Sequence, residues 1–264
     1  MFTGNYHFFE YKYNIPGYSG QDYGGIAQIV YLAVSFVLIV ALLIAMRKTP
    51  RDKALRIVGW LGVFMTVYYI AKTTWESTYD IQRSGSFNIG LLPLDSCSII
   101  MPAAILAGFA KGRVQRYAAA WVSTGSIVGA LGAMVYLTAF RYYPFLSFGA
   151  FYSMSWHFLM LFMGLLLIAT ERPPLRFSMV TDGFLFHFLF SLIVIAVDFI
   201  WDLDFMFYHR MSDIPILNNV ASGLEEKGLA FLTPVLMLCV YFAAFVIVFV
   251  VAAGVRNRKR KAKE

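Results

Sequence analysis

Long apolar runs constrain this chain more than any other feature. Seven runs of about 20 residues carry almost no charge, and each is long enough to cross a hydrocarbon core about 30 Å thick. Apolar residues make up 59% of the chain and charged residues only 14%, whereas soluble domains are about 25% charged. We therefore predict an all-α membrane protein with seven transmembrane helices, in spans near 26–46, 54–75, 90–110, 117–139, 147–170, 177–201 and 229–254.

Basic residues divide unevenly between alternate loops. Most of the 22 lysines and arginines follow the first, third, fifth and seventh runs, as Arg47 and Lys48 do. Because positive charge marks the cytoplasmic side, we expect the N-terminus outside and the C-terminus in the cytoplasm of a multi-pass cell-membrane protein. The net charge of +7 follows from this pattern, so we expect the tail to bind anionic lipid head groups and no nucleic acid.

Three parts of unequal size are expected. Residues 1–25 form an extracytoplasmic aromatic segment that lacks the basic start of a signal peptide, so we expect it in the mature chain. Residues 26–254 form one seven-helix domain with a long outer cap loop at 202–228, and 255–264 form a basic cytoplasmic tail. Both cysteines fall inside predicted spans, so no disulfide, no zinc site and no cofactor is expected.

Ionisable side chains inside a bilayer are costly, which makes each one a functional candidate. Within the predicted spans these are Asp95, His157, His187 and Asp198, with the titratable thiol of Cys97 beside them. At 1.5 Å per residue, the thiol and the two imidazoles reach a similar level, slightly outward of the membrane centre. Equal depth does not by itself bring them into contact.

Helical periodicity sorts these candidates onto faces. In the sixth span, residues at spacings of three and four form one stripe that should face the bundle interior: Gly183, His187, Ser191, Val194 and Asp198. Ser153 and His157 share a face of the fifth span. Lys72 and Glu76 can pair at a span end, and Gly125 and Gly129 allow close helix packing.

Cys97 has an unusual setting for a membrane thiol. Pro93 fits the first turn of a helix, so we expect a helix to begin inside the membrane, with Cys97 about one turn from its positive end. Pro102 loosens that helix because it donates no amide hydrogen to the carbonyl of Ser98. Asp95 lies about 200° from Cys97 on an ideal helix. Cys97 is therefore either a small packing residue or an activated nucleophile.

Three patches of sequence carry a resemblance. The patches are 92–98 (LPLDSCS), 151–157 (FYSMSWH), and Asp198 together with 204–208 (DFMFY). They resemble corresponding segments of the YwaF-like integral membrane protein family. That family often has histidine at the position of Asp95 and asparagine at those of Asp198 and Asp204. The resemblance implies a seven-span fold. Its eukaryotic relatives include a cysteine-dependent acyltransferase that builds ether phospholipids.

Acyl transfer is accordingly the leading hypothesis. The resemblance implies Cys97 as the acyl-accepting nucleophile and His157 as its base, with membrane phospholipids as substrates. Asp95, His187, Asp198 and Asp204 would shape the pocket.

Two other classes stay open. A transporter for protons or a small solute would use Asp95, His157, His187 and Asp198 as a path, and a sensor would bind a ligand under its aromatic cap. The last span has no lysine for a retinal Schiff base and no histidine for a membrane zinc hydrolase.

Overall fold

The computed structural model describes residues 7–15, 25–136, 143–144, 146–171, 174–209 and 215–261, and all regular structure within them is helical. Six helices are long and apolar enough to cross a membrane, which makes the chain a multi-pass membrane protein. They are α1 (Ile26–Ala45), α2 (Arg51–Ser84), α4 (Gly112–Val135), α6 (Phe148–Thr170), α7 (Ser178–Trp201) and α9 (Thr233–Lys261), which follows a 3-10 turn at Ala230–Leu232.

Parts of several predictions lie outside the described residues. They concern most of the aromatic N-terminal segment, the last residues of the predicted fourth span, part of the outer loop and the end of the tail. These positions are 1–6, 16–24, 137–139, 210–214 and 262–264.

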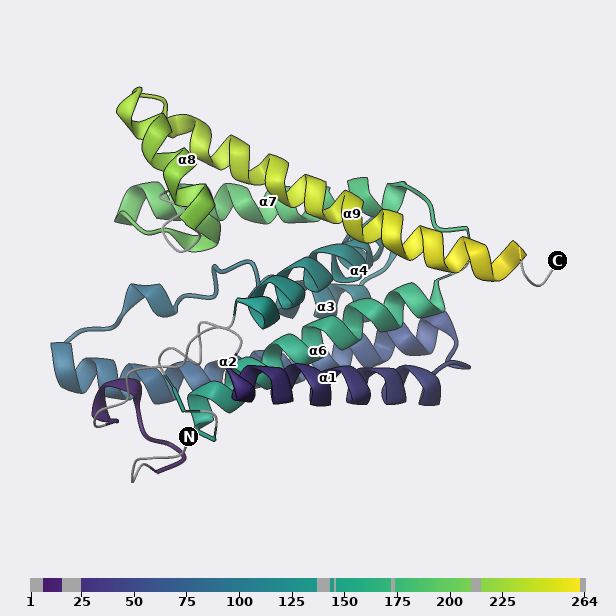
Figure 1. Cartoon of the computed structure of the whole chain (residues 1–264), viewed down its shortest axis with the longest axis horizontal. Helices are drawn as coiled ribbons and strands as arrows, with labels where there is room; N and C mark the ends of the chain where they lie inside the picture. Colours follow the sequence, from purple (N-terminus) through teal and green to yellow (C-terminus); the bar gives the residue numbers. More distant parts are fainter. Residues whose placement is uncertain are drawn as a thin grey trace.

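Helix α4 lies at the centre of the bundle. It contacts α6, α7, α9 and the short helix α3 (Ile100–Phe109), and it is the most buried of the long helices. In Figure 1, α1, α2 and α6 lie on one side of α4 and α7 and α9 on the other, with α8 (Pro215–Glu226) beside the end of α7. Side chains presented by α4 can therefore reach both halves of the molecule.

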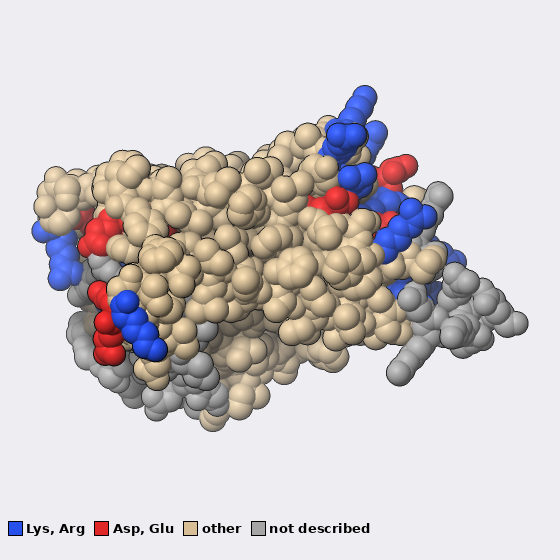
Figure 2. Space-filling model, turned by 90° about the horizontal axis from the view of Figure 1, so that it is seen from above, with Lys and Arg blue, Asp and Glu red and all other residues tan. Residues whose placement is uncertain are grey.

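Charged side chains gather at the two ends of the molecule. Figure 2 shows a broad belt almost without charge between a strongly basic end and a mixed end. Ion pairs join the predicted cytoplasmic loops to one another: Arg51 pairs with Glu171 at 2.8 Å, and Arg116 pairs with Asp182 at 2.9 Å. Arg256 also donates to the Glu171 carbonyl oxygen. The basic loops after α1, α3 and α6 and the start of the tail thus share one end.

The predicted third span is only half helical. Regular helix begins at Ile100, not at Pro93, and α3 is about 15 Å long at 1.5 Å per residue. Pro102 takes the first-turn position expected for Pro93, where an amide hydrogen has no partner within the helix. Residues 92–99 instead form turns, in which the Ser98 amide donates to the Asp95 carbonyl.

Helix α2 continues past residue 75, where the predicted second membrane span ends. It continues to Ser84 because no breaker occurs before Gly85, which takes a left-handed conformation (φ 73°) and caps the helix through the Ile81 carbonyl. Near its other end α2 packs tightly on α3. A Cβ atom on Gly108 would lie 2.4 Å from the Gly59 Cα atom, so only glycine allows this approach.

Both outer segments have structure of their own. In the predicted cap loop, residues Phe205–Phe207 form a 3-10 turn, and α8 follows. In the N-terminal segment, the Tyr11 hydroxyl donates to Asp80 Oδ1 at 2.8 Å, and the Phe148 amide donates to the Phe8 carbonyl oxygen at 2.7 Å. The segment 7–15 is therefore fixed against the end of α2 and the start of α6, which lie away from the basic end.

Candidate functional site

Cys97 lies where three helices meet the irregular segment 92–99. Its sulfur is 3.7 Å from the position that a Cβ atom would take on Gly129 of α4, and Met160 of α6 touches the same position at 3.2 Å. The residue is half-buried, whereas Ser98 and the residues that follow it are buried. Gly129 was predicted to serve helix packing, and in the structure the Met160 methyl group and the thiol both border the position of its missing side chain.

Two amides next to the thiol have no backbone acceptor among the described residues. In segment 92–99 the amides of Leu94 and Ser98 donate to backbone carbonyls. The amides of Ser96 and Cys97 make no backbone hydrogen bond within the described chain. Two adjacent amides without a backbone acceptor beside a nucleophile form a candidate site for an oxyanion.

Two tyrosines that sequence reasoning missed approach the thiol. Tyr152 of α6 and Tyr241 of α9 are close enough to interact electrostatically with Cys97, and the Tyr241 hydroxyl also lies near Ser96. Their rings pack against Trp156 and His187 respectively, at centroid distances of 5.3 and 4.4 Å. No spacing in the sequence relates these tyrosines to Cys97, because each comes from a different helix.

His157 has the tautomer of a general base. Its Nδ1 lies 2.7 Å from the Ser153 carbonyl oxygen, which accepts hydrogen bonds only, so Nδ1 carries the proton. The lone pair of the neutral ring is then on Nε2, where it can accept a proton from a thiol or hydroxyl. This hydrogen bond confirms that Ser153 and His157 share a face of α6.

The same face of α6 turns toward α4. Gly164, seven residues after His157, packs on α4 so closely that a Cβ atom there would lie 2.6 Å from Ile127. Helical spacing therefore puts His157 on the face of α6 that packs on α4, and Cys97 approaches α4 at Gly129. No hydrogen bond joins them within the part of the chain that the structure describes, so proton transfer between them requires a side-chain rotation or a bridging group.

His187 belongs to a closed hydrogen-bond loop that fixes its protonation. The Trp121 indole donates to Nδ1 at 3.3 Å, so the proton of the neutral ring is on Nε2, which faces the Tyr208 hydroxyl at 3.4 Å. The Ser191 hydroxyl donates to the His187 carbonyl at 2.9 Å, so Tyr208 must donate to Ser191 Oγ at 2.5 Å. Every polar atom in this loop has a partner.

Burial reinforces this arrangement. Only 1% of His187 is exposed, and Tyr208 is fully buried. Burial raises the pKa of the Tyr208 phenol, so it stays a donor at neutral pH. The loop therefore acts as a buried polar support for α4 and α7, and the Tyr241 ring of α9 packs against it.

The interior stripe of α7 is confirmed and ends at Asp198. All five stripe residues are buried. Asp198 Oδ1 accepts from the Phe205 amide at 2.9 Å, while its fully buried Oδ2 has no partner among the described residues. Asp198 also lies within electrostatic range of Asp95 and Asp204. Asp204 Oδ1 in turn accepts from the His209 amide at 3.0 Å, so both carboxylates shape the chain after α7.

That chain is strained where the carboxylates hold it. Asp202, Met206 and Phe207 take positive φ angles of 54°, 55° and 62°, a conformation unfavourable for residues other than glycine. The turn brings Tyr208 back onto α7, next to His187 and Ser191. The predicted pocket residues therefore form two groups. Asp95 lies two residues before Cys97 in the chain, whereas His187, Asp198 and Asp204 hold α7 and the turn that follows it.

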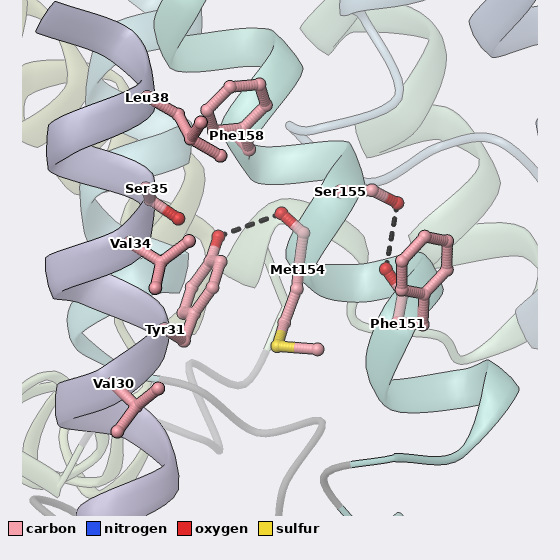
Figure 3. Close-up of a pocket in the computed structure, with 9 residues that line it drawn as sticks. All are labelled: Val30, Tyr31, Val34, Ser35, Leu38, Phe151, Met154, Ser155 and Phe158. Atoms are coloured by element: carbon pink, nitrogen blue, oxygen red, sulfur yellow. Dashed lines mark hydrogen bonds between the residues drawn. The ribbon is translucent and has the colours of Figure 1, made fainter.

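An apolar groove lies on the outside of the bundle, between α1 and α6. Figure 3 shows this groove, which has a volume of about 270 Å³. The Tyr31 hydroxyl crosses it to donate to the Met154 carbonyl oxygen at 2.8 Å. Met154 and Phe158 lie on the opposite side of α6 from Tyr152 and Trp156, so the groove faces away from Cys97.

Comparison with known proteins identifies the family. A family model described as the TMEM164 family matches residues 23–255, which include every described transmembrane helix except the end of α9. The chain therefore belongs to the TMEM164 family. Searches of curated proteins and of solved structures gave no match.

Proposed function

We propose that this TMEM164-family protein is a membrane acyltransferase that moves a fatty acyl group to or between phospholipids through a thioester on Cys97. The observation that carries the proposal is the setting of the thiol. Cys97 is half-buried in a turn between α4 and α6, beside two amides that have no backbone acceptor, and its sulfur lies next to Gly129. The resemblance of residues 92–98 to the YwaF-like family supports the same chemistry.

The proposal includes seven crossings with the N-terminus outside. Both α2 and α4 begin at the basic end of the molecule. Since α2 runs away from that end, the segment 85–111 would return across the molecule to reach the start of α4. α3 and the turns before it then form a third crossing, and the basic end faces the cytoplasm of the cell membrane. There the tail would contact anionic lipid head groups.

The first half-reaction forms the thioester. His157 Nε2 removes the thiol proton as sulfur attacks the ester carbonyl carbon of a donor phospholipid. The amides of Ser96 and Cys97 stabilise the oxyanion of the tetrahedral intermediate. The carbon–oxygen bond then breaks, and the leaving lyso-lipid oxygen takes the proton from His157.

The second half-reaction reverses these roles. A lyso-lipid hydroxyl gives its proton to His157 and attacks the thioester carbonyl, the carbon–sulfur bond breaks, and the thiol recovers the proton. Tyr152 and Tyr241 border the space that the acyl group would occupy, while Asp95, His187, Asp198 and Asp204 hold the surrounding segments.

An acyl-exchange assay tests this function. The protein would be reconstituted in nanodiscs with phospholipid carrying a deuterated acyl chain and an unlabelled lyso-lipid, and label transfer would be followed by lipid mass spectrometry. We expect transfer to be lost in Cys97→Ala and to fall at least 100-fold in His157→Ala. Transfer that persists in Cys97→Ala would refute the proposal. A transporter would be favoured by two results together: a stable protein that transfers no acyl group from any donor lipid, and a proton flux that is lost in Asp198→Asn.

A further inference from the structure

We infer that Lys72 binds the phosphate group of the phospholipid whose ester reaches Cys97, an inference that rests on the proposed function. Lys72 lies on α2 and pairs with Glu76 one turn further along. Its ammonium nitrogen also lies 5.5 Å from the centre of the Tyr152 ring. Tyr152 lies two turns before Met160 on one face of α6, and Met160 and Cys97 approach the same point at Gly129, so the cation lies on the side of α6 that faces the thiol.

The level of Lys72 in the membrane matches a lipid head group. Helix α2 is about 51 Å long, which exceeds a hydrocarbon core of about 30 Å. If Arg56 marks the cytoplasmic boundary, the opposite boundary falls about 20 residues later, near Glu76. Lys72 then starts about 6 Å below that boundary, and its long side chain can extend to the phosphate level.

Cys97 lies deeper on the same side of the bundle. It precedes the first turn of α3, whereas the end of that helix is at the basic end of the molecule. The ester carbonyls of a phospholipid lie below its phosphate along the bilayer normal. One lipid can therefore place its phosphate at Lys72 and an ester at Cys97.

The ion pair leaves the ammonium group able to bind an anion. The Glu76 side chain is 8% exposed and the Lys72 side chain 20%, so the carboxylate lies on the inner side of the pair. An ammonium group has three donors, and Glu76 and the Tyr152 ring do not use all of them. The neighbouring carboxylate of Asp80 does not compete, because Tyr11 and Asn88 donate to its two oxygens at 2.8 and 3.0 Å.

The ion pair with Glu76 does not by itself explain why the charged Lys72 side chain lies at this depth in the membrane. Replacing such a pair by apolar residues is often neutral or stabilising. The ammonium group lies over the Tyr152 ring, which packs 4.7 Å from the Tyr68 ring, and the Tyr68 hydroxyl is hydrogen-bonded to Ser155. This setting orients the cation toward the space beside Tyr152.

Lipid binding measured without catalysis tests the inference. In the Cys97→Ala background, native mass spectrometry would compare retention of phosphatidylcholine with that of diacylglycerol bearing the same acyl chains. We expect Lys72→Gln to weaken phosphatidylcholine binding at least tenfold and to leave diacylglycerol binding unchanged. The matched control is Lys227→Gln, which removes an exposed charge near α8 and should change neither. Inorganic phosphate at equal concentration should compete weakly, which separates a lipid site from a free-phosphate site.

A second comparison keeps the test valid if Lys72→Gln does not fold. The double variant Lys72→Met, Glu76→Gln removes both charges together and is compared with Glu76→Gln alone. We expect Glu76→Gln to bind phosphatidylcholine at least as tightly as the parent, and the double variant to lose that binding. Equal loss of both lipids, or unchanged phosphatidylcholine binding in the double variant, would overturn the inference. Because Cys97 is absent throughout, a failure of acyl transfer would not affect this result.

Discussion

Removing the Tyr208 hydroxyl should destabilise the fold while leaving the chemistry intact. In Tyr208→Phe, the Ser191 hydroxyl still donates to the His187 carbonyl oxygen. The loss of the hydrogen bond that Ser191 Oγ accepts from Tyr208 therefore costs little. The Nε2–H of His187 loses its partner at a site that is only 1% exposed. An orphaned buried donor costs about 1–3 kcal/mol, so we expect the free energy of unfolding to fall by that amount.

A thermal unfolding assay in detergent with a matched variant measures this effect. At about 2–4 °C per kcal/mol, Tyr208→Phe should lower the melting temperature by roughly 2–12 °C. Tyr79→Phe removes the same atom from a half-buried ring stacked on Tyr11 and should change stability by less than about 0.5 kcal/mol. Acylation of Cys97 should persist in both. Unchanged stability with lost acylation in Tyr208→Phe would show that the His187 loop takes part in the reaction, which would refute the reasoning.

Two further predictions concern glycines with contrasting surroundings. Gly129→Val should fill the space between Met160 and the thiol and slow alkylation of Cys97 at least tenfold, as measured by mass spectrometry, whereas Gly132→Val on the same helix meets nothing within 4 Å and should not. Gly108→Ala should lower the free energy of unfolding by about 2 kcal/mol or more, because its Cβ atom would clash with α2 backbone. Equal alkylation rates in the two valine variants, or a fully stable Gly108→Ala, would contradict these assignments.

Hydropathy predicted the long helices well because burial in lipid leaves a clear signal in each run. It gave no sign that α2 continues past the predicted span to Ser84, since Glu76 and Asp80 lower the hydropathy of the last turns although they are buried. It also predicted that the helix of the third span begins at Pro93, whereas regular helix begins at Ile100. Pro93 and Pro102 both suit a first helical turn, and nothing local shows that the chain prefers turns as far as Ser98.

The site was predicted residue by residue but not as an arrangement. The stripe on α7 correctly indicated that His187 and Asp198 are buried, because helical spacing encodes a face. The partners of His187 come from positions 66 and 21 residues away, and no periodicity relates them. For the same reason the sequence could not indicate that the Tyr241 ring of α9 packs against His187.

The most direct test of the account is the state of the Cys97 sulfur. Protein purified in native-like lipid would be analysed by intact mass before and after treatment with neutral hydroxylamine, which cleaves thioesters. The account predicts a fatty-acyl adduct that hydroxylamine removes, that is absent in Cys97→Ala and that is reduced in His157→Ala. A protein that carries no adduct with any donor lipid, and whose Cys97 does not react with alkylating reagents, would contradict it.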